Sequence, residues 1–292
     1  MKNKYCILIL IIFSSFFISC SDETDNNIIN PPIDPTLSQS VFKYPYNINS
    51  FWYYTTRNFV TNLRPDSLSV YFPSDTLVGY GDASFVKDTV INQDTVRLLR
   101  NSHSEPKHSH TTLEYYKQTD SGLIRIAFYS EGANFGPFRP LNTNLTYSVN
   151  GLSFNSLNEI YEHYNSDNSV RGSLIFDDPP ITAIKYPIVQ NEEWNFVSYS
   201  SGTDTTRITK KFTDFETLIL PSGTFYCIKI RRNWYYSSPT PDTNYISFDY
   251  FSKEGMIKRD FRIKDIIISN SNGPIGYIDV KEEANLNLYS IP

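Results

Sequence analysis

The chain has 292 residues, with 26 Lys and Arg against 31 Asp and Glu, and a formal net charge of -5. Without a basic excess it lacks the electrostatic basis for binding nucleic acid, so we expect no nucleic-acid partner. The 22 Tyr and 20 Phe favour β-structure, because aromatic side chains suit a pleated, half-buried surface. We predict an all-β, mainly antiparallel fold with at most one short helix.

Residues 1–19 have the pattern of a secretory signal. Lys2 and Lys4 form a cationic start, and the apolar run that follows to Ser19 is too short to span a bilayer. Phe17-Ile18-Ser19-Cys20 resembles a bacterial lipobox, with Phe17 where Leu is usual. The resemblance implies a lipoprotein signal peptide and lipidation of Cys20, whose acyl chains would hold the protein on a membrane.

Residues 20–40 are rich in Asp, Asn, Ser and Pro, and we predict a flexible acidic tether. Ser21 next to Cys20 resembles outer-membrane sorting, and the acidic cluster 22–25 resembles the surface-export signal of Bacteroidota lipoproteins. The expected location is the outer membrane, facing either the cell surface or the periplasm.

Removal of residues 1–19 takes away Lys2 and Lys4 and moves the formal charge from -5 to -7. Cys6 leaves with the signal and Cys20 carries lipid, so Cys227 has no cysteine left to pair with. Stability must therefore come from a hydrophobic core rather than from a disulfide.

A repeated pattern organises the remainder of the chain. In Tyr44–Trp52 and in Tyr186–Trp194, Pro follows Tyr, Asn lies five positions after Tyr, and Trp lies eight positions after it. We interpret these segments as the openings of two related β-rich halves, 41–180 and 181–292, each a curved sheet or sandwich, which could also pack as one unit. Shared hairpin composition is the alternative explanation.

Further elements follow from the alternation of apolar and polar residues. Segments 224–234 and 245–251 are predicted strands, and the next strand places Ile257, Phe261 and Ile263 on one face. The Arg-Asn pair at 100–101 corresponds to the pair at 232–233. Residues 155–164 are the helical candidate, with an apolar stripe behind an Asn or Ser cap.

The Tyr-Pro…Asn…Trp openings, the turn and strand at 221–225, and the segment 250–258 with its Glu254-Gly255 turn resemble modules of Bacteroidota-type outer-membrane lipoproteins. The chain departs from that pattern in having Asn and Glu where Gly is common before Trp. The resemblance implies a fold similar to the curved antiparallel sheets of periplasmic lipoprotein carriers. It implies no catalytic residue, since a fold does not determine a function.

Histidines gather in one predicted hairpin. His108 and His110 would share a face of a strand, and His103 and Glu105 lie across the turn, an arrangement that could bind a transition metal. Solvated loop histidines are the alternative, favoured by Lys107 in the middle of the segment. No other cofactor is expected.

Two aromatic segments could bind a ligand. Phe135, Phe138 and Arg139 could form a platform for a sugar or peptide, and Trp234-Tyr235 has the same potential. In both places the aromatic rings could instead pack over the core.

The chain has no G-x-S-x-G, H-E-x-x-H or phosphate-binding glycine motif. The leading interpretation is a non-catalytic envelope lipoprotein, a binding or structural module whose partner is a glycan, a lipid or an envelope protein. A carrier of lipid or another hydrophobic ligand is the first alternative, and a surface hydrolase with an active site assembled from distant residues is the second.

Overall fold

The computed structural model describes residues 42–72, 76–105, 108–131, 144–165, 172–201 and 204–292. Antiparallel strands form one continuous sheet, and the described residues contain one α-helix and one short 3-10 helix, η2 (Asp66–Val70). The all-β prediction is confirmed. The first-half strands are β1 (Phe51–Arg64), β2 (Leu77–Ile91), β3 (Asp94–Glu105), β4 (His108–Gln118), β5 (Gly122–Ser130), β6 (Thr146–Val149), β7 (Leu152–Phe154) and β8 (Leu174–Lys185). The second-half strands are β9 (Glu193–Ser201), β10 (Asp204–Leu220), β11 (Gly223–Tyr236), β12 (Tyr245–Ser252), β13 (Gly255–Asn270) and β14 (Gly273–Ser290).

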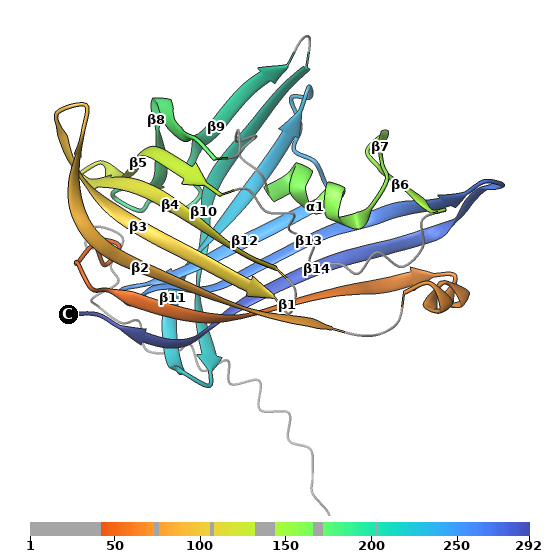
Figure 1. The fold of residues 1–292 in the computed structure, drawn as a ribbon, viewed down its shortest axis with the longest axis horizontal. Helices are drawn as coiled ribbons and strands as arrows, with labels where there is room; N and C mark the ends of the chain where they lie inside the picture. The colour runs from red at the N-terminus through yellow and green to blue at the C-terminus, as the bar shows by residue number, and fades with distance from the viewer. Residues whose placement is uncertain (1–41, 73–75, 106–107, 132–143, 166–171, 202–203) are drawn as a thin grey trace, which may run out of the picture. The chain divides into compact units, whose positions relative to one another are not determined.

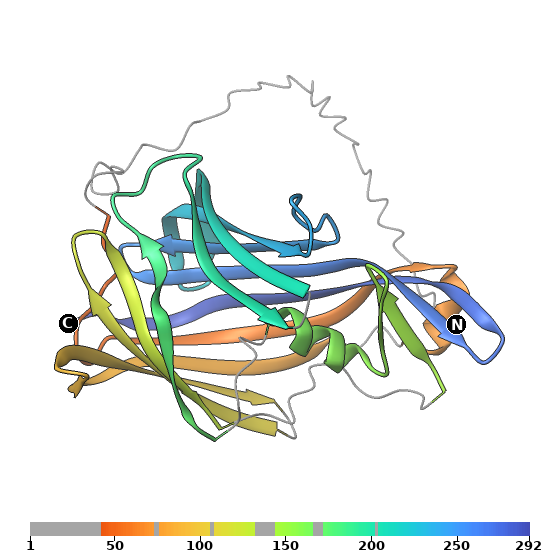
Figure 2. The same cartoon turned by 90° about the horizontal axis from the view of Figure 1, so that it is seen from above.

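The strand order identifies the two edges of the sheet. It runs β8-β5-β4-β3-β2-β1-β14-β13-β12-β11-β10-β9, with β6 and β7 attached beside β13. The two edge strands, β8 and β9, approach each other, and the sheet is a nearly closed barrel (Figures 1 and 2). Trp194 on β9 donates from Nε1 to the carbonyl oxygen of Thr182 on β8 at 3.0 Å. A side-chain contact therefore joins the edges where a backbone ladder does not.

An apolar core fills one end of the barrel interior. Trp52 is fully buried there, and its ring contacts Tyr44 at 5.7 Å and Phe85 at 5.9 Å between centroids. Phe212 and Phe251 belong to the same cluster. The openings of both predicted halves thus supply rings to one core, in keeping with the alternative that the halves pack as one unit.

A second core lies beneath the helix α1 (Leu157–Asn165). The backbone N–H of Glu159 donates to Ser156 Oγ at 3.1 Å, and the Glu159 carboxylate accepts from the backbone N–H of Asn155 at 2.7 Å. These reciprocal bonds cap the helix. Leu157 and Ile160 are buried against the sheet, so the helix predicted for 155–164 is confirmed.

The two halves share several local features. Asn49 and Asn191 both have positive φ, and each donates its backbone N–H to a Phe carbonyl oxygen, Phe85 or Phe212, at 2.8 Å. A register shift follows each of these Phe residues. Strands β1–β5 and β9–β13 are then two meanders of the same order, as a repeat requires. The duplication itself stays a prediction, and its expected boundary at 180/181 falls inside β8.

The strand register moves one of the correspondences predicted from the sequence by one residue. Phe85 lies opposite Leu99, and Phe212 lies opposite Ile230, at the start of each bulge. Asn101 is therefore equivalent to Arg232 rather than to Asn233. By the same register Glu114, opposite Leu99, is equivalent to Asp249, opposite Ile230.

The contact between Gly255 and Trp52 gives a test of the apolar core. Gly255 has φ +108, and a Cβ there would lie 2.4 Å from Trp52 Nε1, whereas Gly273 has φ +112 and open space around it. Both Gly255→Ala and Gly273→Ala incur backbone strain, but only the first forces the ring to move. We expect Gly255→Ala to lower the free energy of unfolding by about 1–3 kcal/mol more than Gly273→Ala, in the range that overpacking a core costs. Urea denaturation measures the difference, and equal losses would contradict the role of the ring.

Candidate functional site

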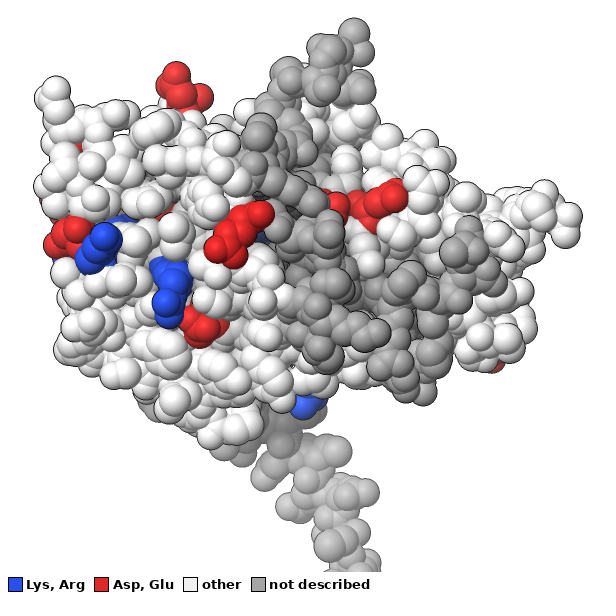
Figure 3. Space-filling model, in the orientation of Figure 1, with Lys and Arg blue, Asp and Glu red and all other residues white. Residues whose placement is uncertain are grey.

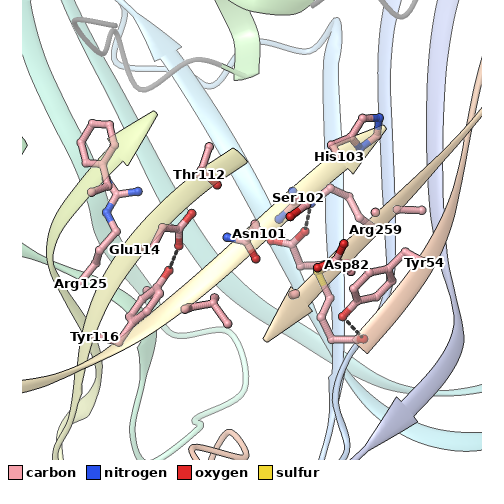
Figure 4. Close-up of a pocket in the computed structure, with 18 of the residues that line it drawn as sticks. Tyr54, Asp82, Asn101, Ser102, His103, Thr112, Glu114, Tyr116, Arg125 and Arg259 are labelled. Atoms are coloured by element: carbon pink, nitrogen blue, oxygen red, sulfur yellow. Dashed lines mark hydrogen bonds and ion pairs between the residues drawn. The ribbon is translucent and has the colours of Figure 1, made fainter. Parts of the chain in front are cut away.

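A cavity of about 770 Å³ lies inside the barrel, bounded by the apolar core and by residues of α1. Its volume is within the range of sites that hold small molecules. Charged side chains reach it from several strands, and Figure 4 shows Glu114, Arg125 and Arg259 among them. The acidic and basic residues lining it are Asp82, Glu114, Arg125, Glu162, Lys210, Arg232, Asp249, Arg259 and Glu282.

The centre of the charged wall is Asp249 on β12, which is 1% exposed. Arg259 Nε on β13 donates to its Oδ1 at 2.7 Å, and Arg232 on β11 lies 3.4 Å from its Oδ2. Burial by itself would raise the pKa of Asp249, but the attraction of Arg259, Arg232 and Lys210 outweighs burial and holds that pKa well below its usual range. The same carboxylate raises the pKa of Arg259. Asp249 is therefore an anion fixed between two guanidinium groups.

Lys210 on β10 stands beside this pair and is 5% exposed. Its Nζ donates to the carbonyl oxygen of Ala183 on β8 at 2.9 Å and lies 4.1 Å from the ring centre of Phe196. Burial, reinforced by repulsion from Arg232, lowers the pKa of Lys210 from 10.5 to about 7, although Asp249 opposes the shift. The amine thus changes charge near neutral pH.

Further polar groups face the cavity from β4, β5 and β14. Glu114 on β4 accepts a hydrogen bond from Tyr116 Oη. Arg125 on β5 pairs with Asp177 on β8 at 2.9 Å, with both side chains almost fully buried. On the β14 wall, Glu282 accepts a hydrogen bond from the Tyr161 hydroxyl of α1. Both walls are polar, but cations concentrate on the second half.

One pattern in the sequence marks this wall. On strands β10 to β14 most inward positions are apolar, and each strand also carries one charged residue that lines the cavity. The charged members are Lys210, Arg232, Asp249, Arg259 and Glu282. A single charge within a core-facing stripe is costly unless it has a partner. Five such charges on adjacent strands indicate a shared polar site.

The predicted metal ligands are only partly described. His103 and His110 are cross-strand neighbours with ring centroids 5.6 Å apart, and both line the cavity. Glu105 and His108 pair across the hairpin, and their side chains lie outside what the structure describes. Within the described side chains, no three His, Cys, Asp or Glu are grouped as metal ligands. The metal site stays a prediction.

Two of the aromatic candidates, Trp234 and Tyr235, are described, and neither lines the cavity. Trp234 is 1% exposed and packs on Tyr164 of α1 at 5.2 Å between centroids, so its position is that of a core residue. Tyr235 is also buried and donates its hydroxyl to Glu193 at 3.0 Å. The predicted platform residues Phe135, Phe138 and Arg139 lie outside the described residues, as does Cys20.

Neither Cys227 nor the face drawn in Figure 3 offers a competing site among the described residues. Cys227 is a free, fully buried thiol, and burial raises its pKa. Figure 3 shows sparse charged side chains on one face, without a large patch of one sign among the residues drawn in white, red or blue.

Comparisons with known proteins give a limited result. No family model matches the chain, and no curated protein matches it. Among solved structures, a Bacteroides fragilis protein described as exported, with a YmcC-like fold, has a TM-score of 0.35 at 11% identity, covering 85% of this chain and 99% of its own. A Parabacteroides distasonis protein described as a lipoprotein has a TM-score of 0.32 at 11% identity, covering 85% and 97%. At these scores we base no functional conclusion on either.

Among the described residues, neither helix combines the length and the apolar character needed to cross a membrane.

The buried amine predicts a pH dependence of stability. The unfolded chain holds the Lys210 proton with a pKa of 10.5 and the folded chain with a pKa of about 7, so between these values the unfolded state binds more protons and stability rises with pH. Relative to Lys210→Met, the free energy of unfolding of the wild type should rise by about 2 kcal/mol from about pH 7.5 to about pH 9, at up to about 1.4 kcal/mol per pH unit.

Lys211→Met serves as the control, because Lys211 lies on the opposite face of β10. Its stability should follow the wild type across the same range. Urea titrations at a series of pH values measure all three proteins, and a constant difference between wild type and Lys210→Met would contradict the lowered pKa.

Proposed function

We propose that this chain is a lipid-anchored protein of the cell envelope that binds a small polar solute inside its barrel, without catalysing a reaction on it. The observation that carries the proposal is the cavity of about 770 Å³ with ionisable groups on both walls. A ligand of the size of one or two sugar rings could be surrounded there and could satisfy several buried polar groups at once.

The envelope location is supported by residues 1–40. The cationic start, the short apolar run and the lipobox-like residues before Cys20 together favour export and acylation. The tether of residues 20–40 would then separate the barrel from the bilayer. Outer-membrane placement, on either leaflet, is the finer part of the proposal and depends on Ser21 and the acidic cluster after it.

The chemistry of the wall favours a polar ligand over an acyl chain. An apolar tail lying against Asp249, Arg259 and Glu282 would remove water from charged groups and return no hydrogen bonds. Apolar side chains also line the cavity, among them Phe128, Ile184 and Phe251, so the preference for a polar ligand depends on the charged groups rather than on the whole lining. A hydroxyl-bearing solute, such as a glycan fragment, fits better than a lipid among the partners that the sequence left open.

Blocking the cavity tests the binding function. Thr112 lines the cavity from β4, whereas Thr111 lies on the opposite face of the strand. A panel of sugars, sugar acids, hydroxy acids and amino acids should contain compounds that raise the melting temperature of the wild type. Thr112→Trp should abolish that rise and Thr111→Trp should retain it, as differential scanning fluorimetry would measure. Native mass spectrometry of gently purified protein that showed a bound fatty acid or phospholipid would instead favour the lipid-carrier alternative.

Lipidation of Cys20 can be tested separately. Wild-type protein expressed in a bacterium with the lipoprotein pathway should separate into the detergent phase of Triton X-114 and should carry several acyl chains by mass spectrometry. Cys20→Ser should move to the aqueous phase and lose the acyl mass. Cleavage at another position, or an aqueous wild type, would contradict the anchor while leaving the cavity proposal untouched.

A further inference from the structure

The charges around Asp249 do not balance when the neighbouring lysine is protonated. Three cations, Lys210, Arg232 and Arg259, face the cavity on adjacent strands, with the carboxylates Asp249 and Glu282 on the same wall. Arg125, farther round the barrel, pairs with its own carboxylate, that of Asp177. Among the cavity-lining residues of β10 to β14 there is therefore one surplus positive charge, which disappears when the lysine is neutral. The carboxylates of Asp82, Glu114 and Glu162 line the cavity from other elements.

Protonated Lys210 has more N–H donors than the described residues provide acceptors for. A protonated amine has three N–H donors, and within the described residues the carbonyl oxygen of Ala183 is the acceptor that Nζ contacts. Both oxygens of Asp249 are directed to arginines rather than to this amine. A ligand anion in the cavity would supply the acceptor and the negative charge that this group lacks.

We propose that the cavity holds an anion-binding subsite beside Lys210 and Arg232, and that Lys210 takes up a proton when the anion binds. The inference rests on the proposed function, since it specifies the chemistry of the polar solute. Asp249 acts as a positioning residue, because it holds Arg232 and Arg259 in place.

The other wall limits the ligand to one anionic end. Glu114 on β4 lies six strands from β12 in the twelve-strand order, on the opposite side of the barrel. Its carboxylate would repel a second anion but accept hydrogen bonds from hydroxyl groups. The structure therefore points to a monoanionic, hydroxyl-bearing organic acid, of which a hexuronate is a simple example.

The proton uptake follows from the groups packed around the amine. Arg232, Arg259 and Arg125 disfavour its charged form and Asp249 favours it, while Phe196 and the Ala183 carbonyl oxygen complete its surroundings. A bound anion adds a second favourable charge at short range. At about pH 8 the free protein holds this amine mostly neutral, so binding should take up close to one proton, and at about pH 6 it should take up almost none.

Calorimetry with paired neutral and acidic probes tests the proposal. We would titrate galactose against galacturonate, glucose against glucuronate, and glycerol against glycerate, in two buffers of different ionisation enthalpy. The acidic member of at least one pair should bind at least tenfold more tightly than its neutral partner, with about one proton taken up at about pH 8. Lys210→Met should remove the uptake and most of the preference, and Lys211→Met, on the opposite face of the strand, should keep both. Circular dichroism would verify that both variants are folded.

Each outcome decides between the two proposals. If neutral and acidic partners bind equally, the anion subsite is wrong and the polar-binding function stands. If acids are preferred without proton uptake, or equally by Lys210→Met, the role of the lysine is overturned. If no member of the whole polar panel binds, both the subsite and the proposed function fail.

Discussion

The interior of this protein depends on the carboxylate of Asp249, because that group allows cations to exist inside the barrel. An isolated guanidinium in such a place would be expensive, and a buried pair is tolerated only when both partners are held in good geometry. Asp249 meets this condition by engaging Arg259 and Arg232 from adjacent strands. The ladder between β11, β12 and β13 sets the spacing, so backbone register determines the electrostatics of the cavity.

The size of the barrel explains why a cavity exists. The side chains of a barrel of about eight strands can fill its interior, whereas the twelve-strand order here encloses more space than aliphatic residues would fill. At one end of the barrel, the larger side chains of Tyr and Phe fill this space and form a packed core around Trp52. The abundance of aromatic residues in the sequence thus has a structural cause. The space that they leave unfilled lies between that core and α1, and both charged and apolar side chains line it.

Much of the fold was predictable, because alternation and turn residues are local signals. The helix at 155–164 and the apolar face of the strand through Ile257 and Phe261 follow from periodicity and capping. Closure of the sheet was not predictable, since it depends on contacts such as that of Trp194 with Thr182 between distant strands. The candidate site was not predictable for a related reason. The charged wall takes one residue from each of five strands, so no cluster of charged residues in the sequence marks it.

The two halves are alike at the residues that set strand register and differ at the residues that face the cavity. By strand register, Asn101 in the first half is equivalent to Arg232 in the second. Ala83, two residues before Phe85, is equivalent to Lys210, two residues before Phe212. The aromatic at the bulge is common to both halves, while the cavity-facing residues differ in charge. The shared residues are those that set strand register and fill the core. Side chains that face the cavity do not set strand register, so the two halves can differ in charge there while they share the same bulge and core aromatic residue.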